Sequence, residues 1–493
     1  MAIRDTVQLG IHPRGRPLRI LVATEYLPPY VSGIANRFKN LVKGYREEGH
    51  VVTVASVAGT ACDIVVPSVP NFFYPAQRMF FFPPLLLLWQ LCNPFRPVPY
   101  DIVHLVSPLC LPLVPLTPIF KLRGVKIYVS YHVYMEFYKK AYFYNKTWLH
   151  KLIGDVIEKL YTWVYFVPLV YLADLVGVPS RTADSVVYRF AKRIHFMRSG
   201  LDTKVFVPKE EGTMDGLLSG ALVREVGKEN GEVGFRKSTG SRVKDLEEFL
   251  PPYSAEDEEV VEAVIPSPSP SGSNGPILVY VGRLAPEKNV QFLIRALAHP
   301  ALQTATLVIV GDGPSRSQLE HLARSTVGEF HVYSNPPPAS TPRDPYSALS
   351  LAPAMAASTA MHRVIFTGMV LSEREIAQYY AHADIFVSAS ASETFGFTVA
   401  EALACGTPAV VVRSGAFATV YKCINQWMFD EDDVTDFVEK VVRCFGEGVE
   451  ARRMSRKLAV GMFGVRLAVG DLLGAYDKIV NGESEGTSQV CIQ

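Results

Sequence analysis

Short apolar runs along the chain alternate with segments whose apolar residues recur at helical spacing. In the first half, five runs predict buried strands, at residues 18–23, 51–56, 101–105, 126–130 and 173–179. Residues 34–48 carry the spacing of an amphipathic helix, which Gly49 is expected to end. Strands that alternate with helices in this way are typical of a parallel α/β sheet covered on both faces.

A second series of the same kind begins at Pro276. Five further runs predict strands, at residues 277–281, 305–310, 363–366, 383–388 and 407–412. A helix is predicted at residues 290–298. The sequence therefore predicts an α/β fold with two doubly wound, Rossmann-like domains, at residues 1–208 and 276–460. Residues 461–493 are expected to form a C-terminal helix and tail.

Two stretches break this alternation. Residues 209–275 contain runs of charge and end in a Pro/Ser repeat, which is typical of a flexible, low-complexity linker. Residues 334–361 are rich in Pro, Ala and Ser and predict a disordered surface insertion. Neither stretch carries residues that indicate chemistry.

Composition and charge narrow the class of protein. The 493 residues are 48% hydrophobic and 20% charged, which is typical of globular domains. A net charge of +1 gives no global electrostatic reason to bind nucleic acid. Seven scattered cysteines without a CxxC pair argue against a zinc site or a disulfide framework and favour a reducing compartment. The apolar stretch at residues 79–92 is too short to span a bilayer, for which about 20 residues are needed.

Two glutamates surround the most informative turn. Glu393 follows the predicted strand 383–388, and Glu401 lies in the helix that comes next, after Phe395 and Gly396. Ligands of open α/β sheets bind at the carboxyl ends of strands, where carboxylates suit hydroxyl-rich groups and a helix start suits phosphate. Taken alone, the pair is equally compatible with a helix cap and a solvated helix residue.

Two more turns point to a bound anion. Arg283 and Lys288 follow the strand 277–281 and place two cations at its carboxyl end, where they suit a phosphate. Gly33 begins a helix after the first strand and permits close approach of the backbone to an anion. The alternative for each is an exposed charge or an ordinary strand-to-helix turn.

These three elements, in this order, resemble glycosyltransferases of family 4. The motifs are the glutamate pair, GRxxxEK at residues 282–288 and GDGP at residues 311–314. The segments YVSGxxNRFxN at 30–40, SYH at 130–132 and GLDxxxFxP at 200–208 look most like the sulfoquinovosyl-diacylglycerol synthase branch. The resemblance implies the GT-B fold, in which two domains face a cleft. It also implies transfer of sulfoquinovose from UDP-sulfoquinovose to diacylglycerol, with retention of configuration.

The resemblance also implies roles for individual residues. Arg283, Lys288 and the start of the helix at Gly33 are expected to hold the leaving diphosphate, with no metal ion or other cofactor. Glu401 is expected to bind the ribose, and Glu393 the donor sugar. The loop containing Gly368, Met369 and Val370 is expected to lie under the base, and His132 near the donor sugar and the acceptor.

The sequence departs from the family pattern after Pro408. Where relatives continue with an Ala-Gly-Gly loop and an acidic residue, this chain has Arg413, Ser414 and a single Gly415. Donors such as GDP-mannose or UDP-glucose therefore remain open, as does a non-catalytic protein that binds nucleotide sugars. A sugar-nucleotide epimerase or dehydrogenase is disfavoured, because the first strand is not followed by GxGxxG.

Aromatic residues and lysines mix in residues 134–151, directly after His132. Tyr134, Phe137, Lys139 and Lys140 are expected to contact the lipid acceptor and a membrane surface. A buried helix with a basic rim is the alternative. A plastid membrane is the location that the resemblance implies, although residues 1–17 lack the serines of a transit peptide, so a cytoplasmic location stays open.

Overall fold

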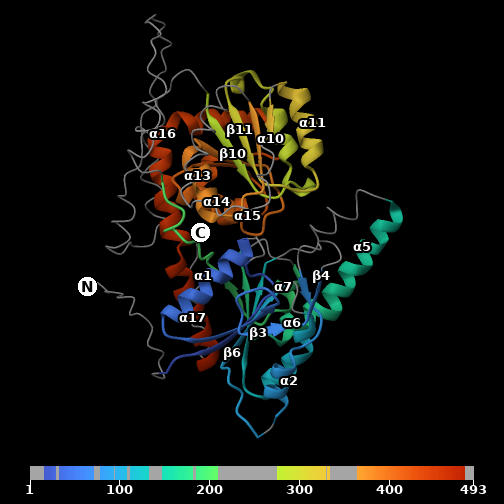
Figure 1. Cartoon of the computed structure of the whole chain (residues 1–493). Helices are drawn as coiled ribbons and strands as arrows, with labels where there is room; N and C mark the ends of the chain where they lie inside the picture. The colour runs from blue at the N-terminus through green and yellow to red at the C-terminus, as the bar shows by residue number, and fades with distance from the viewer. Residues whose placement is uncertain are drawn as a thin grey trace, which may run out of the picture. The chain divides into compact units, whose positions relative to one another are not determined.

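The computed structural model describes two compact units (Figure 1). The first comprises Met1–Asp202, Ser392–Phe397 and Phe463–Val490, and the second comprises Thr203–Ala391, Thr398–Met462 and Cys491–Gln493. The residues that the structure describes are 16–28, 33–70, 78–93, 95–107, 111–132, 147–180, 185–208, 275–328, 330–332 and 363–482. The predicted insertions at 209–275 and 334–361 lie outside them, except for Gly275.

The first unit is built on a parallel sheet of seven strands in the order β3-β2-β1-β6-β7-β8-β9. The strands are β1 (Arg19–Ala23), β2 (Val51–Val57), β3 (Ile64–Val66), β6 (Ile102–Ser107), β7 (Lys126–Tyr131), β8 (Leu175–Val178) and β9 (Ile194–Phe196). A separate antiparallel ribbon pairs β4 (Ser68–Pro70) with β5 (Arg78–Phe80). The order reverses between β1 and β6, which is the topological switch point at which such sheets bind ligands.

Helices cover both faces of this sheet. They are α1 (Gly33–Glu47), α2 (Leu85–Cys92), α3 (Thr117–Leu122), α5 (Trp148–Leu160), α6 (Val167–Leu172), α7 (Ser185–Phe190) and α17 (Val465–Asn481). Alternate residues of β1 enter different cores: Ile20 packs with α1 and α17, and Leu21 packs with the cluster on the other face. This burial on both faces explains why the strand is a continuous apolar run.

The C-terminal helix α17 packs against α1, far from it in sequence. A Cβ added to Gly44 would lie 2.4 Å from Val469 Cγ2, so the absence of a side chain there lets the helices approach closely. The hydroxyls of Tyr45 and Tyr476 are 3.3 Å apart across the same contact. The helix α17 lies within the segment predicted as a C-terminal helix and tail, and it belongs to the first unit.

The second unit contains another parallel sheet of seven strands, in the order β12-β13-β11-β10-β14-β15-β16. The strands are β10 (Ile277–Val281), β11 (Thr306–Val310), β12 (Phe330–Val332), β13 (Val364–Gly368), β14 (Ile385–Ser388), β15 (Ala409–Val412) and β16 (Met428–Phe429). Its helices are α10 (Val290–Ala296), α11 (Arg316–Val327), α13 (Glu373–His382), α14 (Phe397–Ala404), α15 (Gly415–Val420) and α16 (Val434–Phe463). The predicted class, two doubly wound α/β domains, is confirmed. Among the described residues, no helix is long and apolar enough to cross a bilayer.

Candidate functional site

Three loops meet backbone to backbone at the carboxyl edge of the second sheet. They follow β10, β11 and β13 and contain Gly282, Gly311 and Gly368. The Gly311 N–H donates to the carbonyl of Gly368 at 2.9 Å, and the Gly282 N–H donates to the carbonyl of Val310 at 3.0 Å. A Cβ on Gly311 would lie 2.0 Å from the Gly282 carbonyl oxygen, so only glycine fits there. The candidate donor site is therefore assembled by close loop packing at this edge.

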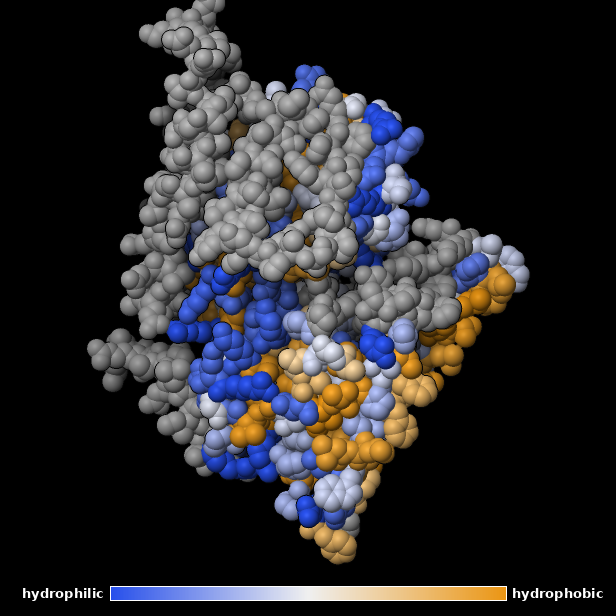
Figure 2. Space-filling model, in the orientation of Figure 1, coloured by the Kyte–Doolittle hydropathy of each residue, from blue (hydrophilic) through white to orange (hydrophobic). Residues whose placement is uncertain are grey.

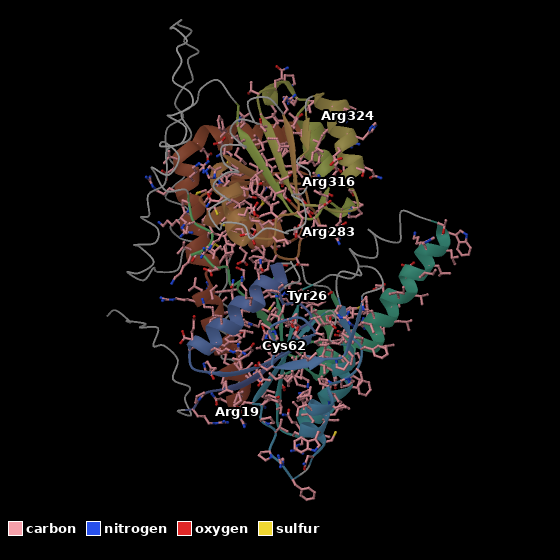
Figure 3. All side chains as sticks on the ribbon, viewed as in Figure 1. Arg19, Tyr26, Cys62, Arg283, Arg316 and Arg324 are labelled. Carbon is pink, nitrogen blue, oxygen red and sulfur yellow. The ribbon has the colours of Figure 1, made fainter. Side chains whose placement is uncertain are left out.

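Arg283 and Lys288 lie on the loop that follows β10. The Arg283 Nη2 pairs with Glu287 Oε1 at 2.5 Å, and both side chains are largely buried. The Tyr280 hydroxyl on β10 donates to the backbone carbonyl of Arg283 at 3.1 Å, which holds the loop against the strand. Lys288 is half-buried and ends the short 3₁₀ turn Pro286–Lys288. Figure 3 shows Arg283 at the edge of the second unit, and the sequence analysis gave no role to its partner Glu287, although the quoted motif contains it.

Glu401 is buried one turn into α14. The Tyr380 hydroxyl on α13 donates to Glu401 Oε2 at 3.0 Å, and Glu401 is 8% exposed. Burial raises the pKa of Glu401 to about 8, against the lowering effect of the Tyr380 hydrogen bond and with a smaller rise from Glu373. Glu401 is therefore a carboxyl group that carries a proton over much of the neutral range. A group of this kind both donates to and accepts from sugar hydroxyls.

Glu393 lies on the turn between β14 and α14, half-buried. Phe395 is buried against the rings of Phe397 and Phe463, with centroids 4.8 and 5.6 Å away. Gly396 has a φ of 84°, a conformation that favours glycine. The sequence analysis placed Glu393 after a strand and Glu401 within the next helix, and the structure has them there.

Gly33 begins α1 in the first unit, to which the turn Ser392–Phe397 also belongs. A Cβ on Gly33 would lie 2.8 Å from Phe397 Cδ2. The structure thus brings two of the predicted turns together and supplies a packing reason for glycine at this position. Its expected contact with phosphate stays a prediction.

His132 directly follows β7 and is 5% exposed. Its ring meets the ring of Phe38 edge to face, with centroids 5.6 Å apart. Burial, followed by the charges of Arg37 and His104, holds the pKa of His132 well below its usual range. The imidazole is therefore neutral at physiological pH, and its Nε2 finds no hydrogen-bond partner among the described residues.

The loop expected under the base follows β13. Gly368 has a φ of 77° and its carbonyl accepts a hydrogen bond from the Thr367 hydroxyl at 3.1 Å. Beyond it, Met369 is 50% exposed and Val370 is half-buried, so the loop presents apolar side chains to solvent. The predicted acceptor residues Tyr134, Phe137, Lys139 and Lys140 lie outside the described residues.

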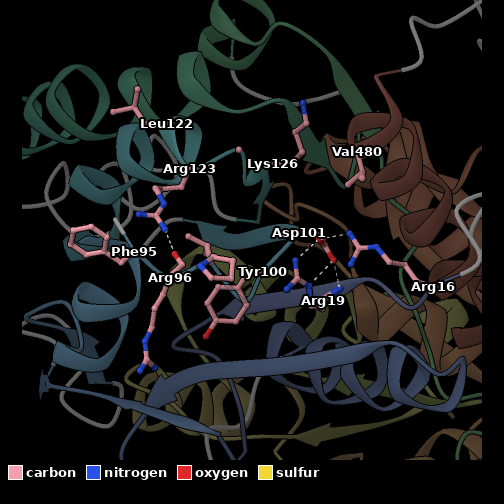
Figure 4. A pocket seen from close by; sticks show the side chains of 13 residues that line it. Arg16, Arg19, Phe95, Arg96, Tyr100, Asp101, Leu122, Arg123, Lys126 and Val480 are labelled. Atoms are coloured by element: carbon pink, nitrogen blue, oxygen red, sulfur yellow. Dashed lines mark hydrogen bonds and ion pairs between the residues drawn. The ribbon is translucent and has the colours of Figure 1, made fainter. Parts of the chain in front are cut away.

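A different hollow, of about 640 Å³, lies at the amino ends of β1, β6 and β7 (Figure 4). Asp101 sits in it and accepts from Arg16 at 3.0 Å and from Arg19 at 2.9 Å. Burial alone would raise the pKa of Asp101, but these hydrogen bonds lower it to about 2. The charges are used in ion pairs and lie at the edge opposite the carboxyl ends, so we do not assign this hollow to catalysis.

Comparisons with known proteins relate the chain to glycosyltransferases. Residues 31–205 match the model of Glycosyltransferase Family 4, and residues 263–333 and 344–447 match two models of Glycosyl transferases group 1. The chain is 25% identical over 457 residues to a sulfoquinovosyl transferase of Arabidopsis thaliana, covering 89% of this chain and 68% of that protein. It is 24% identical over 408 residues to a GDP-mannose-dependent alpha-mannosyltransferase of Mycobacterium tuberculosis, covering 81% of this chain and 80% of that protein.

Solved structures share the architecture. Sucrose-phosphate synthase from Thermosynechococcus elongatus superposes with a TM-score of 0.54 at 16% identity, covering 94% of this chain and 100% of that chain. The catalytic domain of starch synthase IV from Arabidopsis thaliana, bound to ADP and acarbose, gives a TM-score of 0.53 at 14% identity, covering 94% and 100%. Models of Glycosyltransferase Family 4 and of Glycosyl transferases group 1 match parts of both units, and the fold is shared. The chain is therefore a nucleotide-sugar glycosyltransferase of the GT-B type, with domains of these two families.

Proposed function

We propose that the chain transfers sulfoquinovose from UDP-sulfoquinovose to diacylglycerol. The observation that carries the proposal is the similarity to the Arabidopsis sulfoquinovosyl transferase, which extends over 89% of this chain. A stretch covering 27% of the chain is also 32% identical to an alpha-monoglucosyldiacylglycerol synthase of Streptococcus pneumoniae, which supports a glycerolipid acceptor.

The second unit supplies the groups for the nucleotide. Arg283, oriented by Glu287, and Lys288 neutralise the diphosphate as it leaves, so we propose that no metal ion is needed. Glu401, held by Tyr380, binds the ribose hydroxyls. Met369 and Val370 offer an apolar platform to the base, and Glu393 binds hydroxyls of the sugar.

The reaction proceeds with retention at the anomeric carbon. The bond from that carbon to the diphosphate oxygen breaks, and a bond to the diacylglycerol hydroxyl oxygen forms on the same face. The hydroxyl proton passes to the departing phosphate oxygen. Because His132 is held neutral by burial, it contributes a hydrogen bond in the sugar pocket and is not assigned as the general base.

An exposed apolar face on the first unit supports a lipid acceptor. Helix α5 exposes apolar side chains along one side, at Trp148, Leu149, Leu152, Ile153, Val156 and Leu160. Near α2, further apolar residues are exposed: Phe81, Phe82, Leu85, Leu86, Trp89 and Phe95. Figure 2 shows orange side chains over α5 and neighbouring parts of this unit. So large an apolar surface suits contact with a bilayer, from which diacylglycerol is taken.

The experiment is a donor panel with purified protein and vesicles that contain diacylglycerol. UDP-sulfoquinovose, UDP-glucose, UDP-galactose and GDP-mannose are tested separately, each with EDTA. We expect product with UDP-sulfoquinovose and no loss of rate on addition of EDTA. Product with GDP-mannose alone would place the chain with the mannosyltransferases, the second candidate that the similarity to the mycobacterial enzyme supports.

A further inference from the structure

Arg37 has a buried guanidinium group that no described residue hydrogen-bonds. It lies one turn into α1, is 1% exposed, and its Nε, Nη1 and Nη2 all lack a partner within the described part of the chain. Arg456, which is equally buried, donates to the carbonyls of Phe206, Ala404 and Thr203. An arginine buried without such partners is costly, which points to a ligand that supplies them.

The groups around Arg37 do not compensate its charge. The hydroxyls of Tyr45 and Tyr476 contact each other, and Tyr476 Oη also lies 2.6 Å from His104 Nδ1. The nearby carboxylate of Asp471 is paired with His195 at 3.0 Å. The charge of Asp471 acts on Arg37 electrostatically, but no carboxylate among the described residues hydrogen-bonds its guanidinium group.

His132 is a second buried group with a ring nitrogen that lacks a partner among the described residues. Its Nε2 is buried and makes no hydrogen bond with the described residues, and its ring packs on Phe38, the neighbour of Arg37 in α1. The guanidinium charge reaches the imidazole and contributes to its lowered pKa. His132 follows β7 at the carboxyl edge of the first sheet, and Arg37 lies in the second turn of α1. A guanidinium fork and an imidazole N–H together suit a small anion with several oxygens.

We propose that Arg37 and His132 bind the sulfonate group of the donor sugar. The inference rests on the proposed function and adds the residues that select the sugar. A sulfonate carries one negative charge at every physiological pH and three acceptor oxygens, so it can take two N–H groups from Arg37 and one from neutral His132. A neutral hexose would leave the guanidinium buried and unpaired. Arg37 is thus a specificity-determining residue that favours the sulfonated donor over glucose, galactose or mannose.

The test compares Arg37→Met with Tyr45→Phe, a change on the same buried side of α1 that alters no charge. Calorimetry measures the affinity of each variant for UDP-sulfoquinovose and for UDP, and a thermal melt without ligand checks the fold. We expect Arg37→Met to weaken UDP-sulfoquinovose binding about 100-fold or more and to leave UDP binding unchanged. Its melting temperature is expected to equal or exceed that of the wild type, because an unpaired buried charge is removed. Tyr45→Phe should bind both ligands as the wild type does.

Two results would overturn the inference in distinguishable ways. The sulfonate contact would be refuted if Arg37→Met changed the affinities for UDP and UDP-sulfoquinovose equally, or changed neither. In that case, formation of product from UDP-sulfoquinovose by the wild type would still support the proposed function. Absence of that product with the wild type would refute both. If Arg37→Met does not fold, Arg37→Lys replaces it in the test, because it keeps the positive charge and loses the bidentate guanidinium donors. Arg37→Lys should bind UDP-sulfoquinovose about 10-fold more weakly, with UDP binding unchanged.

Discussion

The Tyr380 hydroxyl donates a hydrogen bond of 3.0 Å to Glu401 Oε2, and both side chains are buried in the second unit. Burial raises the pKa of Glu401 to about 8, although the tyrosine bond works in the opposite direction. A group expected from its sequence position to be a plain carboxylate is therefore one that titrates near neutral pH. This has a direct consequence for stability.

Glu401 makes the folded protein less stable as the pH rises. Its pKa of about 8 in the folded protein lies above the ordinary value of 4.5. The stability that comes from its protonated form is therefore fully present below about pH 4.5 and is lost as the pH rises to about 8. We expect the free energy of unfolding to lose up to about 1.4 kcal/mol per pH unit from this group across that window. Urea titrations at pH 5 and pH 8 measure it. Glu401→Gln should flatten the slope, and an unchanged slope in that variant would contradict the assignment.

Removing the cations of the β10 loop should slow the reaction without unfolding the protein. Arg283→Ala and Lys288→Ala are each expected to lower kcat about 100-fold, because a preorganised charge at the leaving group is lost. Arg443→Ala is the matched control, since Arg443 also pairs with a glutamate four residues on, at 3.1 Å, but on α16. Turnover measures the loss of kcat, and thermal melts check that each variant is folded. A fall in kcat as large in Arg443→Ala would show that the effect is not specific to the loop.

Gly311 should tolerate no side chain. Alanine there would place Cβ 2.0 Å from the Gly282 carbonyl oxygen, so the loops that carry the donor site would have to separate. We expect Gly311→Ala to cost about 3 kcal/mol or more in unfolding free energy and to abolish UDP binding. Gly328→Ala is the control, because its φ of 73° is also positive but nothing lies within 4 Å of the added Cβ. That change should cost about 1 kcal/mol, and equal losses in the two variants would refute the packing argument.

The apolar side of α5 should determine binding to membranes. Changing Trp148, Leu152 and Val156 together to serine is expected to weaken binding to diacylglycerol-containing vesicles at least about 10-fold, because exposed apolar area is lost. Sedimentation with vesicles measures this. The control replaces Val442 and Phe445, which are exposed on α16, and should leave binding unchanged. If the triple variant bound vesicles as strongly as the wild type, α5 would be rejected as the contact surface.

Much of the fold was readable from the sequence because parallel strands are buried on both faces. Ile20 and Leu21 face different cores, so their strand appears as an uninterrupted apolar run. The edge strands β9, β12 and β16 have only two or three residues and carry too little pattern to be detected. The packing of α17 on α1 joins Tyr45 to Tyr476, 431 positions apart, and no local spacing reports such a contact.

The site was predicted in part for the same reason. Arg283 and Glu401 occupy the ends of strand and helix patterns, which the sequence locates. The sequence analysis assigned no role to the partners that set the chemistry of these two residues. Tyr380 belongs to an ordinary amphipathic helix and gives no signal. Glu287 is four residues after Arg283, a spacing that permits an ion pair. Arg37 gives no signal at all, because a charged residue in an amphipathic helix is expected on the solvent side.

The most direct test of the central claim is a competition between donors. Equal concentrations of UDP-sulfoquinovose, UDP-glucose, UDP-galactose and GDP-mannose are mixed with the full-length protein and diacylglycerol vesicles, and mass spectrometry identifies the lipid product. We predict that sulfoquinovosyl-diacylglycerol is the main product and that its amount does not depend on added metal. A hexosyl lipid as the main product, with no sulfonated lipid, would contradict the account.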